Sequence, residues 1–551
     1  MASCGWRRTL GFPLGSRQLE AFVLTSSENV DLPRLRPECV GRALPFEIGA
    51  TVNTSNVRFL KVVGAVLALG VTTGIGIGAS AQSALAADNV WSDAQQLATF
   101  PASMFSPMPQ VSFDSSGRAI AIWISNTGSQ GFLVVTSVST DGGTTWSSPA
   151  NVSELDGYAH DAQVSMDSNG RAVAVWDRFA AGDTKVQGSW SADGGLTWST
   201  PVDLSASTAT NPQVRFDSTG TVIATWPNDM GRIVSRSSAD GGATWSAPTD
   251  LSLAGGSAFG VQMSGDTQGK TIATWSRYDG AQNVAQSSTT SDGGLTWSEP
   301  VNISAAGGDA NNPQIRVDSS GRTFMVWNFY QSGVNTVQVS TSTNSGTSWS
   351  DPLDLSPSGV DCQESHVGVD SAGRAIVIWS NFRDGGRVTQ SASSSDGGTT
   401  WSQPLDISAP AGISFNPQIS TDPNGRSLVV WSFSAAGTTY VIQSTSSTDG
   451  GKTWSDPVDL SSADGTANTP NVALDAVGNA IAIWSGYEST DGSYFIQVSN
   501  YSFPLISHNT LPNTGLDSTT ASVAATLGMA LFVIGAVVMF LARRNGRFSP
   551  V

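Results

Sequence analysis

The chain has 551 residues and a formal net charge of −17, and it contains 58 Gly, 18 Trp and only 3 Cys. Three cysteines exclude a disulfide-built scaffold, and the acidic balance argues against a nucleic-acid partner because phosphate binding needs basic surfaces. Hydrophobic residues make up 39% of the chain, which excludes a disordered acidic tail and is enough for a folded core.

The first segment in chain order has the pattern of a secretory signal. Arg58 and Lys61 form a short basic stretch, an apolar run rich in Gly and Ala follows, and Ala84-Leu85-Ala86 matches the small-residue cleavage rule. Residues 57–86 are therefore predicted to be a signal peptide with a helical apolar core; the alternative is a transmembrane anchor. Residues 1–56 show no clear periodicity, and we expect them to be a non-native or disordered extension, with translation starting just after them.

The middle of the chain is one repeat of about 52 residues. Two series of Trp recur at a nearly constant spacing and account for 16 of the 18 Trp residues. The first series is Trp123, Trp176, Trp226, Trp275, Trp327, Trp379, Trp431 and Trp484. The second is Trp91, Trp146, Trp198, Trp245, Trp297, Trp349, Trp401 and Trp454. A period of this size is close to that of β-propeller blades.

Each repeat predicts four short strands. In the first repeat these are Pro109–Phe113, Arg118–Trp123, Phe132–Val138 and Trp146–Ser153. The second strand alternates Ile with Ala, so both of its faces are apolar, which is typical of a strand that is covered on both sides. Small Ala side chains on one face allow the next blade to approach closely.

A motif of the form Ser-x-Asp-x-Gly-x-Thr-Trp lies between the third and fourth strands, and it resembles the Asp-box of sialidase-like (BNR-repeat) propellers. It is complete at 139–146, 191–198, 238–245, 394–401 and 447–454, and nearly complete at 290–297 and 342–349. Its Asp is expected to accept backbone N–H groups across the turn, while Gly supplies a positive φ. We therefore predict a structural role for Asp141, Asp193, Asp240, Asp292, Asp396 and Asp449.

This resemblance implies an all-β fold in which residues 87–503 form a β-propeller of eight four-stranded blades. Trp91–Leu97 has the pattern of a lone fourth strand, whereas Pro470–Ser502 supplies three strands and no fourth. The N-terminal strand is therefore expected to complete the last blade and close the ring, which removes exposed sheet edges. Seven blades or an open array are the alternatives.

The loops at one face of such a propeller vary most, and variable loops on a rigid scaffold commonly carry function. Residues after the second-strand Trp combine aromatic and Arg side chains, which suit a glycan, carboxylate or peptide surface. The candidate ligand rim comprises Arg178, Arg277, Tyr278, Phe329, Tyr330, Phe382, Arg383 and Tyr487. First-strand Gln residues are expected to line the central channel: Gln110, Gln163, Gln213, Gln262, Gln314 and Gln418.

No catalytic residue is assigned. The sialidase resemblance implies an Arg triad, a Tyr nucleophile with a Glu partner, an Asp acid/base and a Phe/Tyr-Arg-Ile-Pro motif, and the motif is absent from this sequence. The only histidines are His160, His366 and His508; the first falls in a predicted loop and the second replaces a channel Gln. No signature of a metal site, a P-loop or a nucleophile elbow is present, so no metal or cofactor is predicted.

The C-terminal segment contains Leu511, Pro512, Asn513, Thr514 and Gly515. This pentapeptide lies in a linker, 504–520, and precedes an apolar run, 521–542, that is long enough to span a bilayer as a helix. Residues 543–551 form a basic tail that would stay cytoplasmic. The order of these parts resembles the LPxTG sorting signal of Gram-positive wall proteins, which implies cleavage by a sortase after Thr514 and covalent attachment to peptidoglycan.

The sequence therefore predicts a secreted, wall-anchored protein that is a monomer. Its expected partners are a sortase, of which it is the substrate, the cell-wall peptidoglycan, and an extracellular glycan or protein ligand; no nucleic acid is expected. Adhesion or recognition is favoured over catalysis. The alternatives are an exo-glycosidase of sialidase type or a polysaccharide-degrading enzyme, and a structural surface spacer.

Overall fold

The computed structural model describes residues 91–503, apart from 102–106, 128–130, 156, 384, 464 and 489–491. The predicted N-terminal extension, signal peptide, sorting motif and apolar segment 521–542 lie outside this part of the chain. Within the described residues, no helix has the length and apolar character needed to cross a membrane. The same residues form 32 β-strands and contain no α-helix, so the predicted all-β class is confirmed.

The strands form consecutive groups of four in which each position recurs along the chain. The first strands are β2 (Gln110–Phe113), β6 (Gly157–Met166), β10 (Gln213–Phe216), β14 (Ser257–Gly265), β18 (Asp309–Val317), β22 (Cys362–Val369), β26 (Ile413–Thr421) and β30 (Thr466–Leu474). The second strands are β3 (Ala119–Asn126), β7 (Ala172–Ala180), β11 (Val222–Pro227), β15 (Thr271–Tyr278), β19 (Thr323–Gln331), β23 (Ala375–Arg383), β27 (Ser427–Ser434) and β31 (Asn479–Tyr487). The third strands are β4 (Gly131–Ser139), β8 (Asp183–Ser191), β12 (Ile233–Ser238), β16 (Asn283–Thr290), β20 (Val334–Ser342), β24 (Gly386–Ser394), β28 (Val441–Ser447) and β32 (Tyr494–Ser502). The fourth strands are β5 (Ala150–Asn151), β9 (Val202–Asp203), β13 (Thr249–Asp250), β17 (Val301–Asn302), β21 (Leu353–Asp354), β25 (Leu405–Asp406), β29 (Val458–Asp459) and, from the start of the described chain, β1 (Gln95–Phe100).

Neighbouring strands within a group pair antiparallel, as in a meander. Four sheets contain one group each, and two eight-stranded sheets contain two groups each. The groups of an eight-stranded sheet are joined by a short parallel contact between a third strand and the next first strand, which is β4 with β6 in one sheet and β24 with β26 in the other. Each group is therefore the structural counterpart of one sequence repeat.

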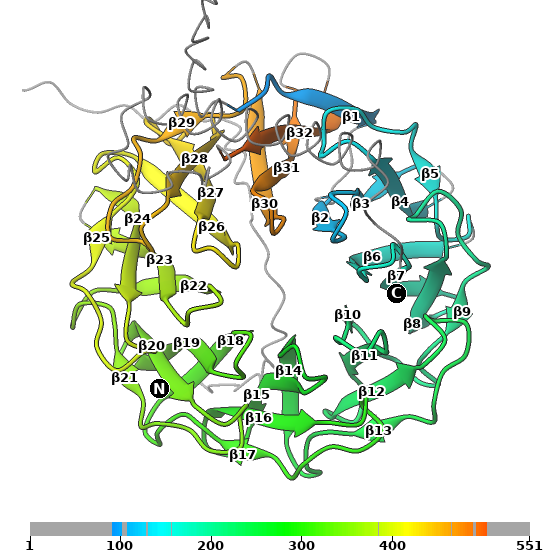
Figure 1. The fold of residues 1–551 in the computed structure, drawn as a ribbon, viewed down its shortest axis with the longest axis horizontal. Coiled ribbons are helices and arrows are strands. Elements are labelled where there is room, and N and C mark those ends of the chain that lie inside the picture. The colour runs from blue at the N-terminus through cyan, green and yellow to red at the C-terminus, as the bar shows by residue number, and fades with distance from the viewer. Residues whose placement is uncertain are drawn as a thin grey trace, which may run out of the picture. The chain divides into compact units, whose positions relative to one another are not determined.

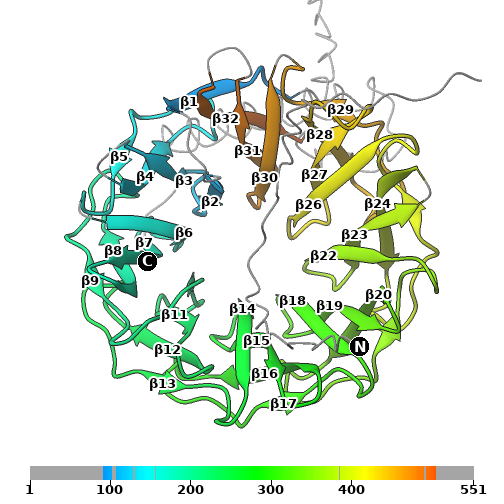
Figure 2. The same cartoon turned by 180° about the vertical axis from the view of Figure 1, so that it is seen from behind.

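The groups lie around a common centre, with the first strands innermost and the fourth strands at the periphery (Figure 1). Figure 2 shows the same arrangement from behind. Consecutive first strands contact one another from β2 to β30, and β30 in turn contacts β2. The last group is completed by β1, which pairs antiparallel with β32 from Gln95 opposite Val498 to Phe100 opposite Tyr494. The predicted completion by an N-terminal strand is therefore confirmed, although this strand begins four residues later than expected.

Two predicted strand boundaries are wrong. The fourth strands that follow an Asp-box are only two residues long, as in Ala150–Asn151, because a Pro such as Pro149 precedes them and has no N–H to donate to a ladder. The second strands continue beyond their Trp, since tight hairpins hold them to the third strands: Arg383 pairs with Gly386 at the tip of one hairpin. The rim residues therefore lie at strand ends and not in loops.

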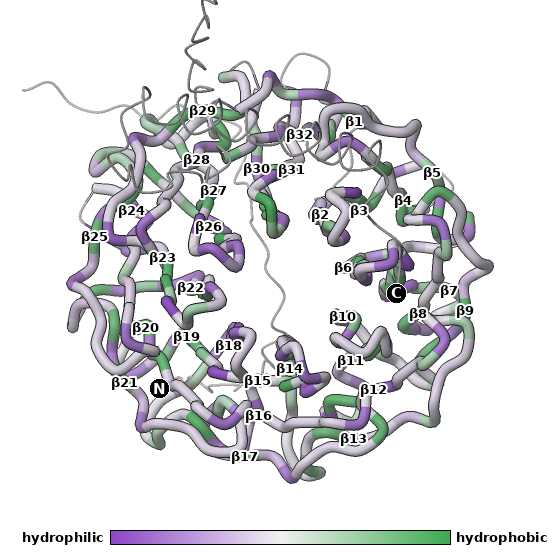
Figure 3. Tube along the Cα trace, in the orientation of Figure 1, coloured by the Kyte–Doolittle hydropathy of each residue, from purple (hydrophilic) through white to green (hydrophobic). Residues whose placement is uncertain are grey.

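The core is a series of interfaces between adjacent groups. Second strands are buried on both faces, as the alternating apolar pattern predicts, and their eight Trp side chains are at most 2% exposed. In one interface, Ile376 and Ile378 of β23 pack against Val429 and Trp431 of β27 in the next group. Figure 3 shows the resulting recurrence of hydrophobic segments and hydrophilic turns around the centre.

Candidate functional site

The antiparallel order gives each group two different ends. At one end lie the turn between the first and second strands and the Asp-box turn between the third and fourth; we call this end the Asp-box rim. At the other end the second strand turns into the third; we call this end the hairpin rim. The two rims differ in chemistry.

At the Asp-box rim, the Asp side chains are fully engaged within their own turns. Asp240 accepts hydrogen bonds from the Ser238 hydroxyl (2.7 Å), the Thr244 backbone N–H (2.9 Å) and the Thr244 hydroxyl (2.6 Å). The Thr244 hydroxyl is the main reason why the pKa of Asp240 falls to about 2. The same Ser and Thr contacts recur at Asp141, Asp193, Asp396 and Asp449, and at Asp292 with Thr290 in place of Ser. This pattern fits the predicted structural role.

The Arg residues of the first turns also lie at the Asp-box rim, and each forms an ion pair with the Asp four residues before it. They are Arg118, Arg171, Arg322, Arg374 and Arg426. Arg171, for example, donates to Asp167 over 2.7 Å and to the carbonyl of Gly220 in the next group over 3.0 Å. These side chains join consecutive groups.

At the hairpin rim, the candidate ligand residues occupy the last positions of five second strands. Arg178 lies on β7, Arg277 and Tyr278 on β15, Phe329 and Tyr330 on β19, Phe382 and Arg383 on β23, and Tyr487 on β31. The topology therefore brings all of them to one end of the groups. Tyr278, Tyr330 and Tyr487 are exposed there.

Three of these residues are committed to the protein's own structure. Phe329 is only 6% exposed and packs with Ala310 and Trp327, because residues two apart on a strand share a face. Its assignment to the ligand rim is therefore wrong. Phe382 lies against the guanidinium of Arg387, 4.3 Å from ring centre to Cζ, and Arg383 donates two hydrogen bonds to Asp406 over 2.8 and 2.7 Å.

Exposed aromatic side chains gather at the hairpin rim. Besides the three Tyr residues above, Tyr158, Phe179 and Phe259 are exposed, and all six are 36–48% accessible. Each lies in the hairpin-rim end of its strand, where for instance Tyr158 is paired with Phe179. Among the described residues, the exposed large side chains of the Asp-box turns are aliphatic, as at Leu196 and Leu295.

A buried acid pair at this rim was missed in the sequence. Asp177 of β7 is 4% exposed and lies beside Asp161, which occupies a bulge of β6 with a φ of +47°. Burial, together with the charge of Asp161, raises the pKa of Asp177 to about 7, and burial also raises the pKa of Asp161. Asp177 accepts the N–H of Asn211 over 3.3 Å, and its other oxygen lies 3.8 Å from Nδ1 of His160. His160 itself is on β6 and not in a loop.

The bulge that holds Asp161 belongs to a repeated feature of the first strands. A residue with positive φ recurs at or just before the hairpin-rim end of every first strand: Met108, Asp161, Asn211, Gly260, Asn312, Glu364, Asn416 and Thr469. Glu364 is the second carboxylate in this set. It accepts hydrogen bonds from Ser380 (2.9 Å) and from the N–H of Asn416 (2.8 Å), and its other oxygen pairs with Arg387 (2.8 Å). The repeat thus presents a variable residue at a fixed backbone position.

The remaining chemical candidates have ordinary structural roles. His366 takes the place of a channel Gln and lies 3.1 Å from Nε2 of Gln418 in the next group. Cys362 is fully buried, and burial raises the pKa of its thiol to about 11, so it is no nucleophile at neutral pH. Within the described residues, no group of three or more His, Cys, Asp or Glu side chains is arranged to hold a metal ion.

Comparison with known proteins agrees with this architecture. A family model described as a BNR repeat-like domain matches residues 75–258, and among curated proteins none matches the chain. One similar solved structure is an ulvan lyase, which is a polysaccharide lyase; it has 11% sequence identity and a TM-score of 0.44, and the match covers 62% of this chain and 93% of that chain. A sialidase from Streptococcus pneumoniae has 14% identity and a TM-score of 0.36, and the match covers 75% of this chain and 71% of that chain. An α-L-arabinofuranosidase from Fusarium graminearum has 16% identity and a TM-score of 0.34, and the match covers 53% of this chain and 91% of that chain. With the Asp-box turns, the family match over residues 75–258 supports a BNR-repeat fold of β-propeller type.

Proposed function

We propose that this chain is a secreted, wall-anchored protein whose closed eight-bladed β-propeller binds extracellular glycans at its hairpin rim. The pairing of β1 with β32 and the contact of β30 with β2 support the closed ring. The observation that carries the binding function is the gathering of six exposed aromatic side chains at one rim. A gathering of exposed apolar surface on one face is typical of a binding surface.

Tyr278 and Tyr330 form the centre of the proposed surface. They end the second strands of adjacent groups, so a ligand with more than one sugar unit can contact both. A Tyr ring offers an apolar face to the C–H groups of a sugar and a hydroxyl at its edge, and Tyr and Arg are enriched among residues that dominate binding energy. Arg277, adjacent to Tyr278, donates to the carbonyl of Ala254 over 3.2 Å and lies beside this surface.

A glycan array followed by titration of the bound glycans tests this proposal. We expect Tyr278→Ala and Tyr330→Ala each to weaken binding about tenfold, which is about 1.4 kcal/mol. Leu295→Ala is the matched control, because Leu295 is an equally large, 58% exposed side chain at the Asp-box rim. Retained affinity in both Tyr variants, or an equal loss in the control, contradicts the assignment of the rim. An array without any bound glycan, with capture of a surface protein instead, contradicts the ligand class.

The proposed wall anchoring is supported by the order of sorting pentapeptide, apolar run and basic tail in the sequence. Fractionation of cells of the native host tests it: the unchanged protein is expected in the cell-wall fraction, from which a muramidase releases it. Thr514→Val is expected to move the protein to the membrane fraction or the medium, because the acyl bond to peptidoglycan would form at Thr514. Ser518→Ala, in the spacer, is the control and should leave the protein in the wall.

A glycan-cleaving enzyme is the second candidate, and the acid pair Asp161 and Asp177 favours it. A carboxylic acid that stays protonated near neutral pH is the group that glycosidases use to protonate a leaving oxygen. Tyr158 and Phe179, two of the exposed aromatic side chains, lie at the same end of β6 and β7. Turnover is measured on a fluorogenic sialoside and on any polysaccharide that binds. Turnover by the unchanged protein that is lost in Asp177→Asn would establish this function, whereas binding without turnover supports recognition alone.

A further inference from the structure

One register position of the first strands lies beside the central channel, in its Asp-box half. This position lies two residues before the Asp of the turn between the first and second strands. The eight groups have Ser112, Ser165, Arg215, Ser264, Arg316, Gly368, Ser420 and Ala473 there. Six of these eight residues are small. The third and fifth groups are the exceptions, and both have Arg.

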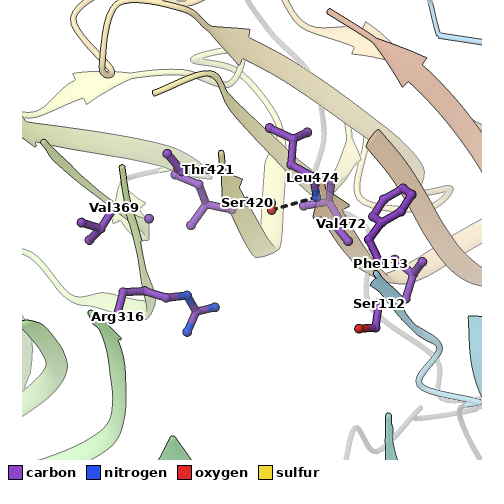
Figure 4. Close-up of a pocket in the computed structure, with 12 residues that line it drawn as sticks. Ser112, Phe113, Arg316, Val369, Ser420, Thr421, Val472 and Leu474 are labelled. Carbon is purple, nitrogen blue, oxygen red and sulfur yellow. Dashed lines mark hydrogen bonds between the residues drawn. The ribbon is translucent and has the colours of Figure 1, made fainter. Parts of the chain in front are cut away.

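This position opens into a cavity of about 250 Å³. The lining residues come from β2, β18, β22, β26 and β30, and at this register they are Ser112, Arg316, Gly368, Ser420 and Ala473. Figure 4 shows the side chain of Arg316 extending into the space between these strands. The Ser420 hydroxyl is already engaged, because it accepts the N–H of Leu474 over 3.0 Å. The small residues leave room beside the Arg316 side chain, the one Arg among the lining residues.

The two channel Arg residues differ from the Arg residues of the turns. Each turn Arg is paired with an Asp, whereas no ion pair to a carboxylate is found for Arg215 or Arg316 within the described part of the chain. Arg316 donates to the carbonyl of Ile315 over 2.8 Å, and Nε of Arg215 is buried without a hydrogen-bond partner. Both guanidinium groups therefore keep donors that the protein does not satisfy.

Arg215 reaches from β10 across β14, the strand that separates it from β18. The absence of a side chain at Gly265 makes this possible, since a Cβ there would lie 2.9 Å from Nη2 of Arg215. Burial lowers the pKa of Arg215 to about 10; the charges of Asp217 and Asp266 oppose this shift, whereas the charge of Arg316 adds to it. The pKa of Arg316 is also lowered, because the surrounding protein reduces its hydration although the side chain is exposed to the channel. The arrangement is thus a pair of like charges, and among the described residues the nearby carboxylates of Asp217 and Asp266 form no salt bridge with either guanidinium.

We propose that this level of the channel binds an oxyanion, a group of the sulfate, phosphate or carboxylate class, between Arg215 and Arg316. Guanidinium groups present several N–H donors in a plane that matches two oxygens of such a group, and an anion between two of them replaces repulsion with attraction. The Ser112 hydroxyl lies at the same level and supplies a further donor. This site is at the opposite end of the groups from the hairpin rim and does not depend on glycan binding there.

Thermal unfolding of the purified protein in sodium sulfate, against sodium chloride at the same ionic strength, tests the proposal. A ligand that binds only the folded state raises Tm with its concentration, and we expect a sulfate-specific rise of a few degrees at millimolar concentrations. Arg316→Gln and Arg215→Gln are each expected to abolish the sulfate-specific rise. Lys452→Gln, which removes an exposed positive charge from an Asp-box turn, is the control and should keep it.

Chloride alone provides a second readout. Arg316→Gln removes the repulsion from Arg215, so its Tm in chloride is expected to equal or exceed that of the unchanged protein, and circular dichroism verifies that the variant is folded. Arg316→Lys keeps the charge without the planar donor array and should retain only part of the sulfate effect. No sulfate-specific rise in the unchanged protein, or the same rise in both Arg→Gln variants, overturns the proposal.

Discussion

Asp177 and Asp240, in neighbouring repeats, show how one type of side chain acquires shifts of opposite direction in its pKa. Asp240 lies at an exposed turn where the Thr244 hydroxyl and N–H stabilise its charged form, and its pKa falls to about 2. Asp177 lies in an interface between groups, where burial and the charge of Asp161 disfavour ionisation, and its pKa rises to about 7. The residue type is the same, so the local donors at Asp240 and the loss of hydration at Asp177 decide the result.

Stability is expected to depend on pH through Asp177. Its pKa in the folded state lies above its ordinary value of 3.8, so the folded state binds this proton more tightly than the unfolded state does. The stabilising contribution is therefore fully present below pH 4 and is lost as the pH rises through about 7. Asp177→Asn is expected to flatten the profile of Tm against pH between these limits. Asp351→Asn, at an exposed position, should leave it unchanged; an identical slope in Asp177→Asn would contradict the assigned acidity.

The Asp-box turn predicts a graded response to substitution at Asp240. Alanine removes all three accepted hydrogen bonds and is expected to lower the free energy of unfolding by about 1–2 kcal/mol. Asparagine is expected to cost much less, because the repeat already contains it: Asn344 accepts the N–H of Ser348 and donates to its hydroxyl, both over 2.9 Å. Urea denaturation measures both variants, and equal losses for Ala and Asn would show that the carboxylate charge is essential.

At the scale of one repeat, Trp residues join strands that are far apart in sequence. Four second-strand Trp residues, Trp275, Trp327, Trp379 and Trp484, donate to a Gln of the third strand. Trp275 donates to Gln286 over 3.0 Å, and Gln286 donates in turn to Asn302 of the fourth strand. The Asp-box Trp commonly donates instead to the preceding group, as Trp297 does to Ser235 over 3.0 Å. In several groups, therefore, one series of Trp joins strands within the repeat, and in several the other series joins the repeat to its predecessor.

A double-mutant cycle measures the fastening between repeats. Trp297→Phe and Ser235→Ala remove the same hydrogen bond, so their effects on the free energy of unfolding should fall short of additivity by about 0.5–1 kcal/mol. The control cycle combines Trp349→Phe with Ser235→Ala. Trp349 donates to Ser287 in another group, so the effects of these two substitutions on the free energy of unfolding should be additive. Additive effects in the first cycle would indicate that the Trp297 contact contributes nothing beyond packing.

The sequence was sufficient for the repeated elements and insufficient for the site. The Trp spacing and the Asp-box specified the turns, the buried second strands and the completion of the last group, since these depend on patterns that recur. Single positions behaved differently: Phe329 and Tyr330 are adjacent aromatic residues, yet one is core and the other exposed because side chains alternate along β19.

The acid pair could not be seen in the sequence, because Asp161 and Asp177 are brought together by a bulge in β6 and by pairing between strands. A deviation was nonetheless present, since Asp177 follows Trp176 where the other repeats have Ser, Asn, Ile or Pro.

At the scale of the whole molecule, stability depends on the first and last described strands meeting. Phe100 of β1 is buried against Ile496 and Val498 of β32, and its ring stacks on that of Tyr494. Without β1, β32 would be an exposed edge and the last group would have three strands. This sheet joins residues about four hundred positions apart in the sequence.

Phe100→Ala is expected to destabilise the whole array rather than one group. The loss should be about 3 kcal/mol, the usual cost of truncating a buried Phe. Leu295→Ala, at an exposed position, is expected to change the free energy of unfolding by no more than about 0.5 kcal/mol. Urea denaturation followed by Trp fluorescence measures both, and a Phe100→Ala protein as stable as the control would show that closure contributes little.

The position of β32 also has a mechanical consequence. Although it is the last strand of the described chain, it lies inside its sheet, with β31 on one edge and β1 on the other. A pulling force that enters the ring from the chain beyond Phe503 therefore cannot peel β32 away as an edge strand; it must rupture hydrogen bonds along both edges at once. Under the proposed tethering by the C-terminal side and the proposed ligand binding at the rim, this arrangement would place the load on a strand that is held along both of its edges.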